Sequence, residues 1–369
     1  MKLSFSLLIF ISIILLNSAC KTQKTSLKAT SLKDAYKDDF LIGTALGTEH
    51  ILERNATANA LIIKQFSSVT PENIMKSEVI HPEQKRYDFT LADRFIAYAQ
   101  KNNLHIVGHT LVWHSQLPKF VSKIQSADSV RLFMTDHINT VAGRYKGKIG
   151  SWDVVNEALE ENGTLRKSVF LNKLGENYIK EAFDLAAKAD PNAELYYNDY
   201  NIEQPAKRKG AIELIKKLQA SGTKINGVGI QGHWNLTGAS LKDIEESIIE
   251  FSNLGLKVAF TELDITVLPN PWDLKGADVN QNFEGSPLMN PYPSGLPDSV
   301  QKSLAIRYEG LFKLFIKHKD KISRVTFWGV NDGHSWLNGW PISGRTNYPL
   351  LFDRAFNPKP AYDAVINLK

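Results

Sequence analysis

The strongest constraint on the fold is the alternation, along the whole chain, of short apolar runs with amphipathic segments. The apolar runs have the length of buried strands and lie at 40–45, 66–70, 105–111, 151–156, 194–198, 227–231, 257–261 and 324–329. The helix-like segments between them include 91–102, 177–189, 206–220 and 241–254. This order predicts a parallel sheet flanked by helices.

Eight strand–helix units favour an α/β fold with a single closed (β/α)8 barrel over an open doubly wound sheet. Such a barrel takes roughly 250 residues, and about 400 or more with insertions, so a chain of 369 residues accommodates one large domain. No Gly-x-Gly-x-x-Gly sequence follows the first predicted strand, which argues against a dinucleotide-binding fold.

The N-terminus has the features of an export signal. Lys2 precedes an apolar run at 3–16, and small residues then lead to Cys20, the only cysteine of the chain. The pattern resembles a bacterial lipoprotein signal with lipid attached to Cys20; the alternative is a plain secretory signal. We expect a signal peptide at 1–19, a lipidated cysteine and flexible tether at 20–33, and the folded domain at 34–369. The protein would be anchored in the periplasm or at the cell surface, or otherwise secreted.

The charge pattern excludes several kinds of partner. The formal net charge is +5, and four lysines lie in the short tether, so the folded domain is close to neutral. A nucleic-acid-binding protein would show a stronger basic patch. The sequence has neither zinc-type Cys/His spacing nor a phosphate-binding loop. We therefore expect the protein to bind no nucleic acid. We also expect a monomer that contacts the membrane only through its lipid anchor.

Polar and aromatic residues gather where the predicted strands end. In a (β/α)8 barrel these carboxyl ends carry the active site. The residues in strand order are Glu72, Asn73, Lys76, His109, Trp113, Gln116, Asn156, Glu157, Asn198, Tyr200, Gln231, His233, Trp234, Glu262, Asp264, Trp328 and Trp336. Any one of them is explained as a rim residue, but the joint pattern predicts a catalytic site.

Two carboxylates in this set suit the hydrolysis of a glycosidic bond. Such hydrolysis needs one acid for the leaving oxygen and a second carboxylate that attacks the sugar or activates water. Glu157 and Glu262 end the fourth and seventh strands, so their side chains can flank one sugar. His233 and Asp264 can hold Glu262 ionised, as a nucleophile requires. Asn156 can hydrogen-bond the 2-hydroxyl of the attacked sugar.

The tryptophans at the strand ends point to a sugar ligand, because an indole face packs well on the C–H face of a pyranose. Five of them lie at or after strand ends: Trp113, Trp234, Trp328, Trp336 and Trp340. The alternative for each one alone is packing within the rim or core, which we expect for Trp152 inside the fourth strand.

At these residues the sequence closely resembles the glycoside hydrolase family 10 xylanases. The motifs come in the family's order from about 41 to 362 and include Thr-Pro-Glu-Asn-Ile-Met-Lys (70–76), Gly-His-Thr-Leu-Val-Trp-His-Ser-Gln (108–116), Trp-Asp-Val-Val-Asn-Glu-Ala-Leu (152–159), Tyr-Asn-Asp-Tyr-Asn (197–201), Gly-Ile-Gln-Gly-His-Trp (229–234), Thr-Glu-Leu-Asp (261–264) and Trp-Gly-Val-Asn-Asp-Gly-His-Ser-Trp (328–336). Each motif alone is a moderate signal, whereas together they are very specific.

The resemblance implies endo-cleavage of β-1,4-xylan with retention, without a metal or organic cofactor. It implies Glu157 as acid/base and Glu262 as nucleophile, with support from Asn156, Gln231, His233 and Asp264. The residues that it implies for binding xylan and xylo-oligosaccharides are Glu72, Asn73, Lys76, His109, Trp113, Gln116, Tyr200, Trp328 and Trp336. The first six match positions that hold sugars on the non-reducing side of the cut, and the last two match indoles that roof the cleft there. Ser77 and His81 depart from the family's usual Trp and Glu, which concerns details of sugar binding beside the cleft.

Two features stay open in the sequence. The segment 268–297 is rich in Pro, Asn and Gly and is longer than in minimal family members; it is either a cover for the cleft or a neutral surface insertion. The alternative functions are a retaining β-1,4-glucanase on the same barrel and a non-catalytic glycan-binding surface lipoprotein. The second would keep the tryptophans and lose a carboxylate, whereas this chain has both.

Overall fold

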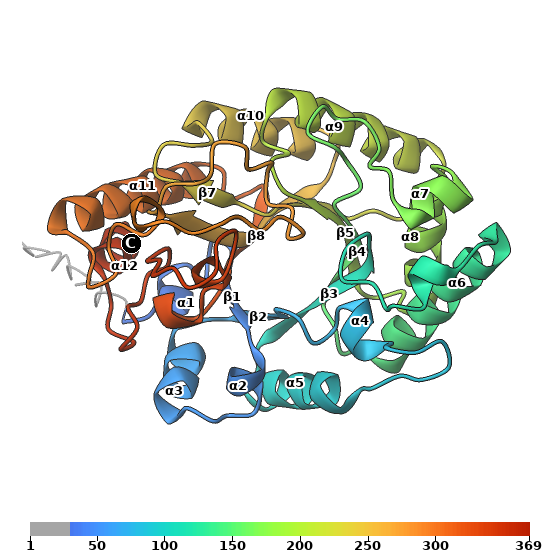
Figure 1. Cartoon of the computed structure of the whole chain (residues 1–369), viewed down its shortest axis with the longest axis horizontal. Coiled ribbons are helices and arrows are strands. Elements are labelled where there is room, and N and C mark those ends of the chain that lie inside the picture. Colours follow the sequence, from blue (N-terminus) through green and yellow to red (C-terminus); the bar gives the residue numbers. More distant parts are fainter. Residues whose placement is uncertain (1–29) are drawn as a thin grey trace, which may run out of the picture.

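The computed structural model describes residues 30–369, which form a closed barrel of parallel strands within a ring of helices (Figure 1). The predicted signal peptide at 1–19 and Cys20 lie outside the described residues. The barrel strands are β1 (Leu41–Leu46), β2 (Ser68–Pro71), β3 (His105–Trp113), β4 (Ser151–Asn156), β5 (Glu194–Asp199), β6 (Gly227–Ile230), β8 (Lys257–Thr266) and β9 (Ile322–Phe327). The (β/α)8 barrel predicted from the alternation is therefore confirmed.

Each barrel strand pairs in parallel with its neighbours, and the pairing of β6 with β8 closes the ring. The register aligns Gly43 with Ser68 between β1 and β2, and Val228 with Val258 between β6 and β8. The sequence pattern did not predict β7 (His233–Asn235), a short strand that pairs with the last residues of β8. Because β7 aligns His233 with Asp264, it places two predicted site residues side by side.

The longer helices that cover the barrel are α3 (Ala56–Gln65), α5 (Thr90–Lys101), α6 (Ala127–Arg144), α8 (Tyr178–Ala189), α9 (Pro205–Ala220), α10 (Leu241–Ser252) and α11 (Asp298–Lys317). Shorter helices are α1 (Leu32–Ala35), α2 (Thr48–Ile51), α4 (Ser77–Ile80), α7 (Val169–Leu174) and α12 (Pro360–Ile366). Single 3-10 turns are η1 (Val121–Lys123), η2 (Pro287–Met289), η3 (Asp332–His334) and η4 (Trp336–Asn338). Among residues 30–369, no helix has both the length and the apolar character to cross a membrane.

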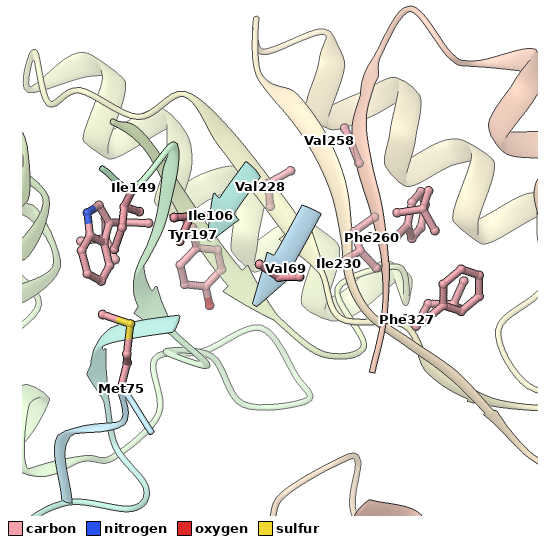
Figure 2. Packing of buried hydrophobic residues seen from close by; sticks show 14 of the residues in the cluster. Val69, Met75, Ile106, Ile149, Tyr197, Val228, Ile230, Val258, Phe260 and Phe327 are labelled. Atoms are coloured by element: carbon pink, nitrogen blue, oxygen red, sulfur yellow. The ribbon is translucent and has the colours of Figure 1, made fainter. Parts of the chain in front are cut away.

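The main core lies between the strands and the helices. On α10, Ile244, Ile248 and Phe251 share one buried face, and each contributes about 1.5–3 kcal/mol by leaving water. In the same core, Phe260 of β8 packs on Phe315 of α11 with ring centroids 4.1 Å apart. Figure 2 shows part of this core, including Phe260, Val258 and Ile230. The packing fixes where the carboxyl ends of the strands lie.

The folded domain begins before residue 34. Ser31 caps α1 by accepting a hydrogen bond from the backbone N–H of Asp34. Leu32 is fully buried, and its N–H donates to Oε1 of Gln65 at 2.9 Å. The structured part therefore includes Leu32 and Lys33, which the sequence pattern places in the tether.

Candidate active site

The carboxyl ends of the strands enclose a cavity of about 180 Å³. Its lining residues come from most of the predicted strand ends and are Glu72, Asn73, Lys76, His109, Trp113, Gln116, Asn156, Glu157, Gln231, His233, Glu262, Ala277, Val279, Trp328 and Trp336. The structure thus brings together the two predicted catalytic carboxylates, three of their four supporting residues and eight of the nine predicted sugar-binding residues.

Glu157 lies at the end of β4 among neutral hydrogen-bond donors. Trp113 donates from Nε1 to its Oε2 (2.8 Å), while Gln231 and Asn156 donate to its Oε1 (2.9 and 3.1 Å). The carboxyl is buried, and this burial raises its pKa above the usual value. The backbone of Glu157 adopts a left-handed conformation with φ of 57°, which is uncommon for a residue other than glycine and is concentrated at functional sites.

Glu262, on β8, has a different environment. Asn198 donates to its Oε1 (2.9 Å), and Nε2 of His233 lies 3.2 Å from its Oε2. Burial acts to raise the pKa of this carboxyl. The hydrogen bond from His233 and the electrostatic effect of the His109 and His233 side chains outweigh burial, so the pKa lies below its usual value. At neutral pH this arrangement holds Glu262 ionised.

His233 owes its charge to two carboxylates. Its Nδ1 lies 3.0 Å from Oδ1 of Asp264, whose other oxygen accepts a hydrogen bond from Trp336 Nε1 at 2.7 Å. Burial lowers the pKa of the imidazole, but Asp264 and Glu262 overcome this effect and raise it to about 10. The ring is therefore an imidazolium that donates from both nitrogens. Asp264 does not line the catalytic cavity and acts through its contact with His233.

One residue connects the surroundings of the two carboxylates. Asn198 donates from Nδ2 both to Glu262 and to Oδ1 of Asn156 (2.8 Å), and its own Oδ1 accepts from Thr261 (2.6 Å). The hydroxyl of Thr261 thus fixes the orientation of the Asn198 amide. Sequence reasoning placed Asn198 at the rim but gave it no role; its position at the end of β5, between the two catalytic strands, was the available signal.

Two buried charged side chains, those of Asp153 and Arg324, support His109 from inside the barrel. Nδ1 of His109 lies 3.0 Å from Asp153, and the other oxygen of Asp153 lies 3.5 Å from Nη2 of Arg324. Asp153 and Arg324 are both almost fully buried, and they come from β4 and β9. Neither residue was predicted, because inward-facing residues within a strand are indistinguishable from its core residues until the strand's neighbours are known.

On the side of β2 and β3, Lys76 organises a second polar group. Its Nζ donates to Asn73 and to Gln116, both at 2.9 Å, and lies 4.9 Å from the ring centroid of Trp113. Burial lowers the pKa of Lys76 and raises that of the nearby Glu72. These side chains form a wall of donors and acceptors suited to sugar hydroxyls.

The glycosyl hydrolase family 10 model matches residues 31–368, which is nearly all of the described part of the chain. The chain belongs to glycoside hydrolase family 10. Endo-1,4-beta-xylanase A of Xylanibacter ruminicola is 45% identical over 92% of this chain and 93% of its own length. Beta-1,4-xylanase of Dictyoglomus thermophilum is 41% identical over 98% of each chain. A solved GH10 endoxylanase from a sugarcane soil metagenome has a TM-score of 0.89 at 48% identity and covers 92% of this chain and 100% of its own.

Tyr200 is the predicted binding residue that does not line the catalytic cavity of this family 10 barrel. It is buried; its hydroxyl accepts a hydrogen bond from Arg166 (2.6 Å), and Nζ of Lys207 lies 3.6 Å from the centroid of its ring. Gly276 lies so close that a Cβ there would come within 2.4 Å of the Tyr200 ring. The assignment of Tyr200 to sugar binding stays a prediction.

The long segment 268–297 reaches the catalytic cavity of the family 10 barrel. Ala277 and Val279 line the cavity, and Ser115 donates to Oδ1 of Asn280 at 3.3 Å. The segment follows β8 and forms part of the cavity wall. Sequence reasoning could not identify Ala277 or Val279, because small and β-branched residues in a loop carry no chemical signal.

A metal ion has one candidate location within residues 30–369, where ligand atoms of Glu49, His50 and His334 lie within 4.8 Å of one another. The N–H of Gly47 donates to Nδ1 of His50 at 3.1 Å, and burial lowers the pKa of His50 to about 4. The neutral ring therefore carries its proton on Nε2. Because a metal-bound imidazole needs a free lone pair there and a donor at its other nitrogen, this trio does not fit a metal site.

Proposed function

We propose that this chain is an endo-β-1,4-xylanase that cleaves the main chain of xylan with retention of configuration. The observation that carries the proposal is the contrast between two buried carboxyls in one cavity. The pKa of Glu157 is raised by burial, whereas that of Glu262 is lowered by His233 and His109. Carboxyls whose environments shift their pKa values apart are suited to the roles of acid and nucleophile.

In the first step of the proposed reaction, an ionised oxygen of Glu262 attacks the anomeric carbon of a bound xylose. The bond from that carbon to the glycosidic oxygen breaks, and Glu157 gives its proton to the departing oxygen. The products are a glycosyl ester on Glu262 and a free chain end with a new hydroxyl. Glu157, now ionised, is ready to act as a base.

In the second step, Glu157 takes a proton from a water molecule, whose oxygen attacks the same anomeric carbon. The ester bond breaks, and Glu262 leaves as a carboxylate. Two inversions at one carbon give net retention. His233 stabilises the departing carboxylate through its Nε2 contact at 3.2 Å. Burial and the returned negative charge of Glu262 together raise the pKa of Glu157 for the next cycle.

Two observations support xylan as the substrate. One is the pair of tryptophans in the site, and the other is the activity named for similar proteins. Trp328 and Trp336 line the cavity, with ring centroids 6.3 and 4.8 Å from that of His233. Their indole faces suit a xylose ring, which lacks the hydroxymethyl group of glucose. Relatives that align with over nine-tenths of the chain carry the name endo-1,4-beta-xylanase. A β-1,4-glucanase would need room for the extra group beside these indoles.

The test is hydrolysis of linear xylan, with carboxymethyl cellulose and mixed-linkage β-glucan in parallel and product sizes followed over time. We expect a rapid fall in the chain length of xylan, short xylo-oligosaccharides, and little action on the glucans. Preferred cleavage of the glucans would contradict xylan as the substrate, while the proposed retaining mechanism would still stand. Binding to xylan without cleavage would instead favour the glycan-binding alternative.

We also propose that the protein is exported as a monomeric lipoprotein, with residues 1–19 removed, Cys20 lipidated and the catalytic domain following the tether. The charged start, short apolar run and single cysteine support this proposal. Incorporation of labelled palmitate into the wild type, and its loss in Cys20→Ser, is the expected result. Equal labelling of both proteins, or of neither, would contradict lipidation at Cys20.

A further inference from the structure

Trp272 differs from every other tryptophan of the chain. All seven tryptophans lie within residues 30–369, and six of them are buried or partly buried. The side chain of Trp272 is 95% exposed. A bare indole leaves a large apolar surface in contact with water. Trp272 belongs to the segment 268–297, which forms part of the catalytic cavity wall. Its exposed indole is therefore a candidate contact for substrate that extends beyond the cavity.

The part of this segment that carries Trp272 is held in place by hydrogen bonds. Arg345 donates to the carbonyl oxygen of Pro269 at 3.0 Å, on the N-terminal side of Trp272. On its C-terminal side, the side chain of Gln281 both accepts from the N–H of Lys275 (2.8 Å) and donates to its carbonyl oxygen (2.7 Å). Trp272 is therefore presented from a braced stretch of chain.

A second cavity, of about 220 Å³, lies beside this stretch. Pro271 and Leu274, on either side of Trp272 in sequence, line it, and so does Trp234. The second cavity shares His233 and Ala277 with the catalytic cavity. The two cavities therefore adjoin, and the second lies on the side of the stretch that bears Trp272.

The direction of the sugar chain follows from the proposed function, on which this inference rests. The group around Lys76 and Glu72 lies in the catalytic cavity and is the side that the family resemblance assigns to the non-reducing part of the substrate. The second cavity, lined by residues that follow β5, β7 and β8, then receives the reducing-end part, which departs after the first step. A long chain that leaves this cavity passes the loop at Pro271–Leu274.

We propose that Trp272 is a binding platform for a distal xylose unit on the reducing-end side of xylan. The exposed indole stacks on the C–H face of a pyranose beyond the second cavity and so raises the affinity for long chains. The segment 268–297 thereby selects for polymer length. Short substrates, which end before Trp272, gain nothing from it.

The test compares wild type, Trp272→Ala and Trp272→Phe on two substrates, linear xylan and a chromogenic aryl β-xylobioside. The aryl substrate places both of its sugars on the non-reducing side. We expect Trp272→Ala to raise KM for xylan about fivefold to tenfold, with kcat/KM for the aryl substrate unchanged. Trp272→Phe should recover most of the affinity for xylan. Leu288→Ala is the matched control, because Leu288 is an 82% exposed apolar residue of the same segment.

The outcomes separate this inference from the proposed function. An unchanged KM for xylan in Trp272→Ala, with an active wild type, would overturn the platform alone. Equal losses on both substrates, or an equal effect of Leu288→Ala, would also overturn it, because either points to a general disturbance of the segment or to self-association through its apolar surface. A wild type that cleaves neither substrate would overturn the proposed function and the platform with it.

Discussion

Replacing His233 with Asn removes the positive charge beside Glu262 while leaving a donor for Asp264. In the wild type, the ring lies between Asp264 (3.0 Å) and Glu262 (3.2 Å). The Asn side chain reaches the first partner and is too short for the second. The effect of burial on Glu262 is then no longer offset by the hydrogen bond from His233, so the pKa of Glu262 rises. The nucleophile is consequently protonated over a wider acidic range.

The loss of activity follows from one hydrogen bond to a charged group, worth about 1.5–3 kcal/mol. This corresponds to a fall in kcat/KM of about tenfold to a hundredfold at neutral pH. The assay is kcat/KM against pH on an aryl β-xylobioside, whose good leaving group needs little help from Glu157. We expect the acidic limb to move to higher pH in His233→Asn. His233→Gln, which restores a neutral donor near Glu262, should recover part of the loss.

The same variant changes how stability depends on pH. The pKa of His233 is raised from 6.5 to about 10, so its contribution is fully present below pH 6.5 and is lost as the pH rises through about 10. The rise corresponds to on the order of 5 kcal/mol, which is an upper bound because protonation of Glu262 in the variant removes part of the unpaired negative charge. Urea denaturation should show a difference between wild type and His233→Asn that shrinks from pH 6.5 to 10. A constant difference, together with an unshifted acidic limb, would refute this account of His233.

Two further substitutions test the division of roles and the packing beneath the site. Glu157→Ala should lower kcat on xylan about a hundredfold or more, yet release a rapid burst of leaving group from an activated aryl xyloside; the absence of a burst would mean that the roles are divided differently. Gly108→Ala should lower the free energy of unfolding by about 1–3 kcal/mol, since its Cβ would lie 2.1 Å from the Trp152 ring. As the matched control in urea denaturation, Gly143→Ala adds a methyl to open space on α6 and should stabilise by about 0.5–1 kcal/mol; equal destabilisation by both would contradict this packing argument.

Much of the barrel could be predicted because a buried parallel strand is apolar throughout and ends abruptly in polar residues. The predicted run at 151–156 coincides with β4, and the helix expected at 241–254 is observed as Leu241–Ser252. The short strand β7 was missed, because three residues give no periodicity. It forms only where it meets the extended end of β8, a contact that is distant in sequence.

The residues of the site could be predicted because the carboxyl ends of all the barrel strands lie at one rim. The pairing of His233 with Asp264 follows from their positions after neighbouring strands. The role of Asn198 as a link between Asn156 and Glu262 depends on side-chain orientation, which the strand pattern does not contain. The burial of Tyr200 depends on Arg166, Lys207 and the loop at Gly276, which come from three distant segments.

The central claim is that Glu262 forms a covalent bond with the sugar. The most direct measurement is mass spectrometry of peptides after inactivation with an activated 2-deoxy-2-fluoro-β-xylobioside, which slows the second step more than the first. We predict one fluoroxylobiosyl group per chain, on the peptide and side chain of Glu262, and no labelling of Glu262→Ala. A label on Glu157 or on another residue, or no label while xylan is still hydrolysed with retention, would contradict the account.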